Sequence, residues 1–205
     1  MAASKLSLYV KRLMLAAVCL FIAFITSCAS PGITLFKLVP EQGQVSTRAI
    51  HDGKVILSAR YLDAGERAVY LRQKGYEILG QGLQQISLVT FVLEVENGSD
   101  QKFILDPVSI RLIVGYGPPL SPYNYAHLYM ALPPDSDRER ILVDLKKAIF
   151  DESTTIKPGE KVRKLLLFSR PEEVSPAAAL IFERLYVGHK EYRAALDFRT
   201  IDLEK

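Results

Sequence analysis

The segment that most restricts the fold of this chain is the alternating stretch that ends at Asn97. Residues 88–96 read LVTFVLEVE, with apolar side chains at every second position: Val89, Phe91, Leu93 and Val95. A period of two places these side chains on one face of a β-strand. Asn97-Gly98 follows directly, and this pair is typical of a tight hairpin turn with positive φ angles. The stretch therefore predicts a strand packed against a core, followed by a sharp reversal.

Further segments show the same strand signature, bounded by turn residues. Pro107 interrupts one of them, so pairing should break there, and turns are expected at Pro158-Gly159 and at Gly188-His189. The predicted strands are 54–62, 101–114, 161–168, 178–187 and 191–201. About six strands separated by turns predict a mainly β chain folded as an antiparallel β-sandwich.

Two segments change to helical spacing. Asp63 followed by Glu66 forms a capping box, and Gly75 fits the end of a helix of about three turns. Apolar residues at helical spacing predict a second helix over about 137–150. The stretch between, 115–135, contains so many prolines that regular structure is not expected over much of it. Two short inserted helices, one between the first strands and one in a long crossover, are too few for a parallel α/β sheet.

The N-terminus has the pattern of a secretory signal peptide. Lys5, Lys11 and Arg12 precede an uncharged apolar run over residues 13–25. This run is shorter than the ~20 residues that a membrane-spanning helix needs. An uncleaved anchor beginning near Leu6 remains an alternative.

The apolar run ends in Ile25-Thr26-Ser27-Cys28, which resembles a bacterial lipobox. The resemblance implies cleavage before Cys28, a diacylglyceryl group on its thiol and an acylated new amine. Three acyl chains, at ~0.8 kcal/mol per buried CH₂, would anchor the chain firmly in a membrane. Within that family Ala29 favours the outer membrane, so we expect a lipid anchor on its periplasmic face. An ordinary signal peptidase site, with Ser27 and Ala29 as the small residues, is the other alternative.

These signals divide the chain into three parts. Residues 1–27 are a lipoprotein signal peptide, residues 28–50 are the lipidated cysteine and a flexible tether, and residues 51–205 are the β-sandwich. The Pro-, Gly- and Ser-containing composition of 29–50 suggests the tether, with one stray strand near 33–39.

Charge and cysteine content exclude some functions. The chain has 26 basic and 23 acidic residues, but three of the basic residues lie in the signal peptide, which leaves 23 of each sign. No basic footprint for nucleic acid is therefore expected. Cys28 would be the only cysteine left after cleavage, so the domain must fold without an internal disulfide.

The strings FVLEVENGSDQKFILDP and IKPGEKVRKLLLF resemble the immunoglobulin-like domains of bacterial exported lipoproteins, over roughly residues 55–200. Many relatives have a glycine midway along the second string, where this chain has Lys164. The resemblance implies an immunoglobulin-like sandwich and supplies no catalytic residues.

The residues also give no signal for catalysis or metal binding. His51, His127 and His189 lack the spacing of metal ligands. Neither a Gly-x-Ser-x-Gly elbow nor a phosphate-binding loop occurs. We therefore expect no enzyme activity, no metal and no cofactor apart from the covalent lipid on Cys28; an enzyme of unrecognised type is the least favoured alternative.

One stretch, 116–130, has the character of a contact surface. Tyrosine is common at interfaces because it offers a large apolar body with a polar tip. The candidate contact residues are Tyr116, Tyr123, Tyr125, His127 and Tyr129. The favoured hypothesis is a non-enzymatic adaptor or structural module that contacts an envelope protein. The alternative is a small-molecule or glycan-binding module with a pocket of ~300–1,000 Å³ lined by Tyr123, Tyr125 and Tyr129. Rings folded back onto the sandwich would be a purely structural explanation.

Overall fold

The computed structural model describes residues 36–41, 43–132, 137–172 and 175–202. The predicted signal peptide 1–27 and Cys28 lie outside these ranges. In the described residues ten strands form two antiparallel sheets, accompanied by four α-helices and one short 3₁₀ helix. The mainly β, antiparallel prediction is confirmed.

The first sheet has six strands and runs in the order β1-β10-β9-β5-β7, with β6 also paired to β9. Its strands are β1 (Phe36–Pro40), β5 (Phe103–Leu105), β6 (Ile110–Val114), β7 (Thr154–Ile156), β9 (Ala177–Val187) and β10 (Lys190–Asp202). The second sheet runs in the order β2-β3-β4-β8. Its strands are β2 (Ser46–Ile50), β3 (Val55–Leu62), β4 (Leu88–Asn97) and β8 (Lys161–Ser169). The break predicted at Pro107 is the 3₁₀ helix Pro107–Ser109 between β5 and β6.

The two sheets share one hydrophobic core, to which alternate side chains of both contribute. Phe91 of β4 lies at the centre of this core. Its ring centroid is 5.0 Å from that of Phe198 on β10. The centroids of Tyr61 on β3 and Phe168 on β8 lie 6.0 and 6.1 Å away. Such edge and tilted contacts are the favoured geometry of aromatic pairs. The period-two pattern of residues 89–95 therefore does mark a core-facing strand.

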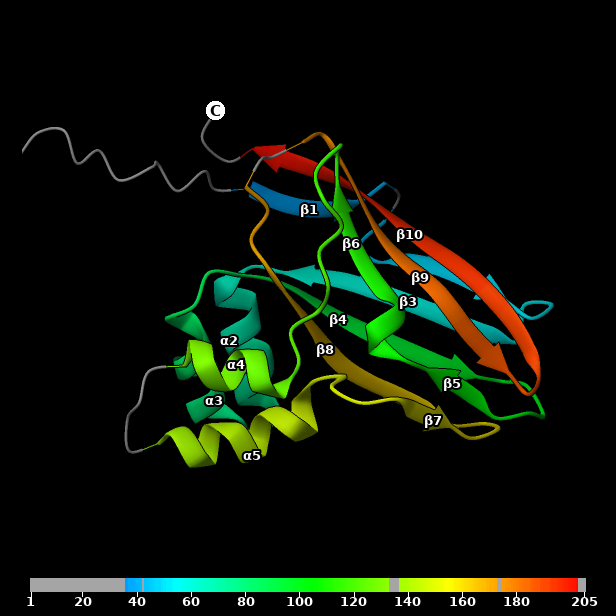
Figure 1. The fold of residues 1–205 in the computed structure, drawn as a ribbon, viewed down its shortest axis with the longest axis horizontal. Coiled ribbons are helices and arrows are strands. Elements are labelled where there is room, and N and C mark those ends of the chain that lie inside the picture. The colour runs from blue at the N-terminus through cyan, green and yellow to red at the C-terminus, as the bar shows by residue number, and fades with distance from the viewer. Residues whose placement is uncertain (1–35, 42, 133–136, 173–174, 203–205) are drawn as a thin grey trace, which may run out of the picture. The chain divides into compact units, whose positions relative to one another are not determined.

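A second hydrophobic core covers part of the other face of the β2-β3-β4-β8 sheet, over β4, β8 and the end of β3. There Val92, Leu165 and Leu167 pack against helices, which Figure 1 shows gathered on one side of this sheet. This double burial explains why residues 165–168, LLLF, do not alternate with polar residues. The helices are α2 (Ala64–Gln73), α3 (Glu77–Gln84), α4 (Tyr125–Ala131) and α5 (Arg138–Ala148).

Helices α2 and α5 were predicted, and the capping box of α2 is present. The Asp63 carboxylate accepts from the Glu66 backbone N–H at 2.8 Å, and the Glu66 carboxylate accepts from the Asp63 N–H at 3.1 Å. The prediction of only two helices is wrong, because α3 and α4 are also present. The two glycines of α3 weaken its helical signal, although Gly82 fits a close approach: an added Cβ would lie 2.9 Å from Ile141 of α5.

Arg67 of α2 is fully buried between the sheet and the four helices, which we call the helical layer. Its guanidinium donates to the Thr90 hydroxyl of β4 at 3.0 Å and to the Leu83 carbonyl of α3 at 2.8 Å. Burial lowers the pKa of Arg67 from its ordinary value, because the charged form loses its hydration. These two hydrogen bonds compensate part of that loss and set the position of α2 and α3 over β4.

The prediction that residues 28–50 form a tether is wrong for residues 36–50. Strand β1 pairs with β10 from Phe36 opposite Asp202 to Pro40 opposite Phe198, and β2 pairs with β3. Phe36 and Leu38 are buried in the shared core. The short segment 36–40, FKLVP, has alternating buried residues, and pairing with β10 holds it in the sheet. In the described residues the folded domain therefore begins at Phe36 and not at residue 51.

The predicted hairpin at Asn97-Gly98 is also wrong. Neither residue has a positive φ angle, and the strand that follows, β5, belongs to the other sheet. The buried Asn97 amide group donates to the carbonyls of Gln101 at 2.8 Å and Ile156 at 3.0 Å. Its oxygen accepts from the Ser99 hydroxyl at 2.6 Å and the Ser99 backbone N–H at 3.1 Å. Asn97 therefore joins the end of one sheet to the start of the other.

We expect Asn97→Ala to lower the free energy of unfolding by about 2–4 kcal/mol, because it leaves buried carbonyl and Ser99 groups without partners. Urea denaturation would measure this. Asp100→Asn, an exposed change in the same turn, is the control and should stay within about 0.5 kcal/mol of the wild type. Equal effects of the two changes would contradict the role given to Asn97.

Candidate functional site

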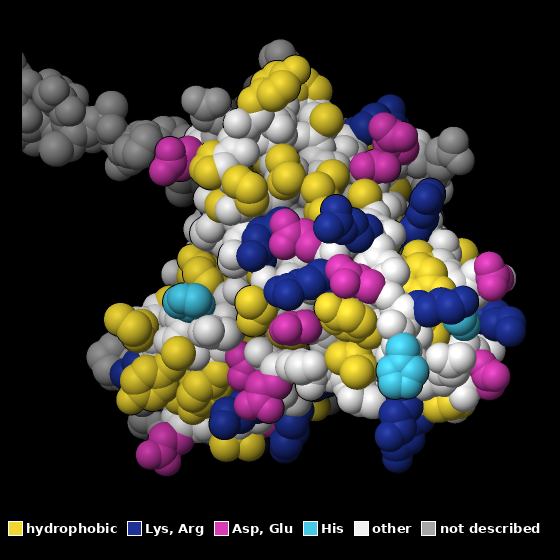
Figure 2. Space-filling model, turned by 45° about the vertical axis from the view of Figure 1, so that its right-hand side comes forward, with side chains coloured by type: hydrophobic (Ala, Val, Ile, Leu, Met, Phe, Trp, Pro, Cys, Tyr) yellow, Lys and Arg dark blue, Asp and Glu magenta, His cyan; other side chains and the backbone are white. Residues whose placement is uncertain are grey.

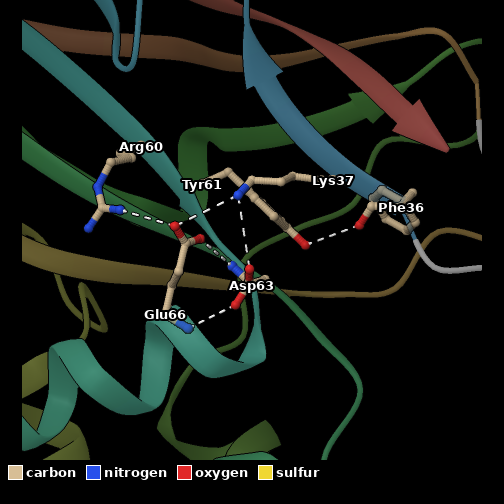
Figure 3. A network of polar contacts seen from close by, with 6 residues as sticks. All are labelled: Phe36, Lys37, Arg60, Tyr61, Asp63 and Glu66. Carbon is tan, nitrogen blue, oxygen red and sulfur yellow. Dashed lines mark hydrogen bonds and ion pairs between the residues drawn. The ribbon is translucent and has the colours of Figure 1, made fainter. Parts of the chain in front are cut away.

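The start of β1 is held by a network of polar contacts with β3 and α2 (Figure 3). The Tyr61 hydroxyl donates to the Phe36 carbonyl at 3.4 Å. Lys37 Nζ lies 3.7 Å from Glu66 and 4.0 Å from Asp63, and Arg60 lies 3.7 Å from Glu66. Each of these half-exposed ion pairs contributes ~0–1 kcal/mol. Together with pairing to β10 they determine where the chain enters the folded domain.

The Tyr61 hydroxyl stays protonated in this network. Burial, and after it the negative charge of Asp63, raises the pKa of Tyr61 above its ordinary value. A neutral phenol can donate to the Phe36 carbonyl, whereas a phenolate could not. The contact at the start of β1 is therefore maintained over the ordinary pH range.

A pocket of about 480 Å³ lies at the same end of the sheets. Its lining comes from the loop after β6 and the segment after β8: Val114, Tyr116, Gly117, Pro118, Leu120, Ser169, Arg170, Pro171 and Glu172. The Arg170 guanidinium stands over the Phe36 ring, 5.5 Å from its centroid. We call this region, from Phe36 to these two loops, the β1 end.

The two loops of the β1 end are tied together. Gly115 donates from its backbone N–H to the Ala177 carbonyl at 2.9 Å, at the point where β9 begins. Its φ of 56° lies in the left-handed region, and an added Cβ would lie 2.3 Å from the Ser175 side chain. Only glycine fits both conditions. Next to this turn Tyr116 is fully exposed.

The five candidate contact residues do not form one site. Tyr116 lies at the β1 end, whereas Tyr123, Tyr125, His127 and Tyr129 lie in or beside α4 on the helical layer. The expectation of irregular structure is wrong for residues 125–131. Asn124 caps α4 by accepting from the His127 backbone N–H at 3.0 Å, and helical packing supplies the rest.

Tyr123 and Tyr125 are half-buried and pack against the helical core. The Tyr123 backbone N–H donates to the Leu167 carbonyl of β8 at 2.6 Å, and the Tyr125 backbone N–H donates to the Asp151 carboxylate at 2.6 Å. Lys146 of α5 stands over the Tyr125 ring at 4.6 Å from its centroid. These two tyrosines attach α4 to the sheet and to α5. The 480 Å³ pocket is lined by Tyr116 and not by Tyr123, Tyr125 or Tyr129.

The outer side of α4 is exposed. His127, Tyr129 and Met130, which we call the α4 surface, all face solvent, and the Met130 side chain is 82% exposed. The Arg138 guanidinium stacks on the Tyr129 ring, 3.9 Å from its centroid, and hydrogen-bonds the Tyr129 carbonyl. Figure 2 shows hydrophobic side chains gathered over the helical layer, at the lower left. An exposed aromatic residue with Met and Arg beside it is the composition typical of a contact surface.

Sequence reasoning missed Met130, Arg170 and Pro171. Met130 stands in a proline-flanked stretch, so its position on a helix could not be inferred. Arg170 and Pro171 follow β8 and reach the loop after β6 only through sheet packing.

Two further findings concern the described ranges only. No cluster of three or more His, Cys, Asp or Glu side chains there could hold a metal ion. Nor does any helix within these ranges have the length and apolar character needed to cross a membrane.

Comparison with known proteins shows distant structural likeness only. No family model matches the chain, and no curated protein matches it. The chain is similar to a FixG-related protein from Vibrio parahaemolyticus, with a TM-score of 0.36 and 12% identity over 73% of this chain and 95% of the other. It is also similar to the yjhA protein from Bacillus subtilis, with a TM-score of 0.32 and 10% identity over 73% and 71%. Likeness at this level carries no functional argument.

We expect Phe36→Ala to lower the free energy of unfolding by about 3 kcal/mol, because it removes a buried ring from the shared core at the start of β1. The control is Lys37→Ala on the same strand, which removes only half-exposed ion pairs and should cost under about 1 kcal/mol. Thermal or urea unfolding of both variants would measure these changes in the free energy of unfolding. A neutral Phe36→Ala would mean that this segment is a tether after all.

Proposed function

We propose that this chain is an envelope lipoprotein, anchored through lipid on Cys28 to the periplasmic face of the outer membrane. The observation that carries the proposal is the run from Lys11 to Cys28: basic residues, an uncharged apolar stretch and Ile25-Thr26-Ser27-Cys28. Three acyl chains on Cys28 would make the attachment effectively permanent on the time scale of exchange between membranes.

The position of the first strand indicates where a domain anchored in this way would lie. Phe36 lies only eight residues after Cys28, and eight residues span at most about 29 Å. An anchored body would therefore stay close to the bilayer. Such tethering raises the local concentration of the domain near other membrane components, which is the mechanism by which a non-enzymatic adaptor acts.

The α4 surface is the region that we propose contacts an envelope protein. Tyr129 and Met130 offer apolar contact area, and Arg138, stacked on Tyr129, offers hydrogen-bond donors beside it. The neighbouring helix α5 adds the exposed Val143. This mixture suits a protein interface with an apolar centre and a polar rim. We propose a structural or adaptor role and no enzyme activity.

We also propose that the two sheets form an immunoglobulin-like sandwich. The order β3-β4-β8 in one sheet corresponds to strands A-B-E of that fold, and the order β10-β9-β5 in the other corresponds to G-F-C. In this correspondence α2 and α3 are an insertion between A and B. Phe91, packed on Phe168 and Phe198, occupies the core that a disulfide bridges in antibody domains.

The alternative, a small-molecule or glycan-binding module, rests on the pocket beside Tyr116. Its volume of about 480 Å³ falls within the range of ligand sites. Arg170 and Glu172 are the charged groups that would orient a ligand there. Because loops supply most of the lining and the Tyr116 ring is fully exposed, we favour the adaptor.

Cys28→Ser tests the anchor. We expect the wild type to incorporate labelled palmitate and to fractionate with membranes, and the variant to do neither, because serine offers no thiol for the lipid. Cys19→Ser, inside the apolar run, is the matched control and should behave as the wild type. A wild-type chain that takes up no palmitate would favour plain secretion or an uncleaved anchor.

Met130→Asp tests the α4 surface. We expect it to reduce in-cell crosslinking to envelope proteins several-fold, because a carboxylate at the centre of an apolar contact is costly to desolvate. The melting temperature should not change, since the side chain is exposed. Val108→Asp, at an exposed position on the 3₁₀ helix, is the control. If both variants crosslink like the wild type, the α4 surface is not the contact.

A further inference from the structure

We propose that the β1 end of the domain rests on the bilayer, with the Tyr116 ring inserted among the lipid headgroups. This inference rests on the proposed lipid anchor at Cys28 and goes beyond it, because it assigns a second, non-covalent membrane contact and an orientation to the domain.

The β1 end exposes apolar groups that the folded domain does not cover. Tyr116 is fully exposed, and Pro118, Pro119 and Pro176 beside it are also exposed. Ile201, near the end of β10, is 46% exposed. Figure 2 shows hydrophobic side chains gathered at the top of the molecule, where Figure 1 places the loop after β6. Exposed apolar side chains gathered at one end of a domain are candidates for contact with a membrane or a partner.

The chain enters the folded domain at this same end. Arg170, which lines the Tyr116 pocket, lies 5.5 Å from the Phe36 ring centroid. Because Phe36 follows Cys28 by only eight residues, a lipid on Cys28 would hold this end within about 29 Å of the bilayer surface. Strand β10 has 13 residues and runs from the opposite end to this one, a length of about 43 Å. The β1 end is therefore the end that reaches the membrane first.

The chemistry of the β1 end fits an interface between water and lipid. Tyrosine is enriched at the headgroup level, where its ring is shielded and its hydroxyl stays hydrated. Arg170 can pair with lipid phosphates through its guanidinium. The exposed Glu172 beside it offsets that positive charge, so the contact should depend on apolar insertion more than on anionic lipid.

The loop that presents Tyr116 is preorganised for such a contact. Gly115 is pinned to Ala177 by a hydrogen bond, and Pro118 and Pro119 restrict the backbone that follows. In addition, Leu120 forms an isolated bridge with Leu112 of β6, through hydrogen bonds of 2.8 and 2.9 Å. Ordering this loop on a membrane would therefore cost little conformational entropy.

The chain contains no tryptophan, so a single introduced indole can report on one position. The experiment uses the full chain with Tyr116→Trp, purified from membranes and reconstituted into phosphatidylcholine vesicles with and without phosphatidylglycerol. Intact mass of each sample reports whether Cys28 carries lipid. Because Tyr116 is exposed, the change should leave the fold intact, which circular dichroism would verify. The matched control is Tyr129→Trp on the α4 surface.

If the inference holds, the indole emission of the Tyr116→Trp variant is shifted to the blue. Bromine-labelled acyl chains quench it several-fold more than they quench the emission of the Tyr129→Trp variant, and iodide in the water quenches it less. The result should be nearly the same in both vesicle types, because apolar insertion dominates the contact.

Three outcomes would overturn the inference, and they are distinguishable. If the protein is lipidated and the two variants respond alike, the membrane contact is wrong and the anchor stands. A protein with no lipid on Cys28 overturns both the contact and the anchor. If the indole of the Tyr116→Trp variant is already shielded from iodide without vesicles, the residue lies in the pocket and the proposed membrane contact is wrong.

Discussion

Residues 89–93 of strand β4 and 165–168 of strand β8 are buried, and both hydrophobic cores of this protein are built on them. On one face Phe91 and Phe168 pack against the β1-β10-β9 side of the fold, and on the other Val92 and Leu165 pack under the helices. These shielded residues carry no charge, whereas the other halves of the two strands present Glu96, Lys161 and Arg163 to water. Among the described residues, Arg67 is the charged side chain buried in this region, and it donates a hydrogen bond to Thr90 of β4.

This layering affects where apolar side chains are left exposed. The exposed apolar surfaces described above are the outside of α4 and the β1 end of the sheets. They belong to different layers of the fold. In our proposals one surface contacts a protein partner and the other a bilayer, so a domain anchored as proposed would face the membrane and still present its helices to a partner.

The success of sequence reasoning differed from element to element for physical reasons. The strand at residues 88–97 and helix α2 with its capping box were predictable, because period and capping are local properties. The turn at Asn97-Gly98 was not, since the Asn97 side chain satisfies carbonyls from residues 101 and 156, which only the folded chain brings together. Helix α4 was missed because prolines flank it and packing on α5 and β8 stabilises it. The tyrosines of one segment looked like one site, yet Tyr116 and Tyr129 belong to separate surfaces.

Residue order alone indicates that the chain is mainly β and where most of its strands lie, and its N-terminus resembles a lipoprotein signal. These properties reside in residue order: alternation, turn residues, and an apolar run that ends at a cysteine. Tertiary packing was needed to show that the described fold begins at Phe36, that the helices form a layer, and that Tyr116 lies at the same end of the sheets as the start of β1. Those facts depend on pairing between residues far apart in the chain, such as Phe36 with Asp202, and no local pattern carries that information.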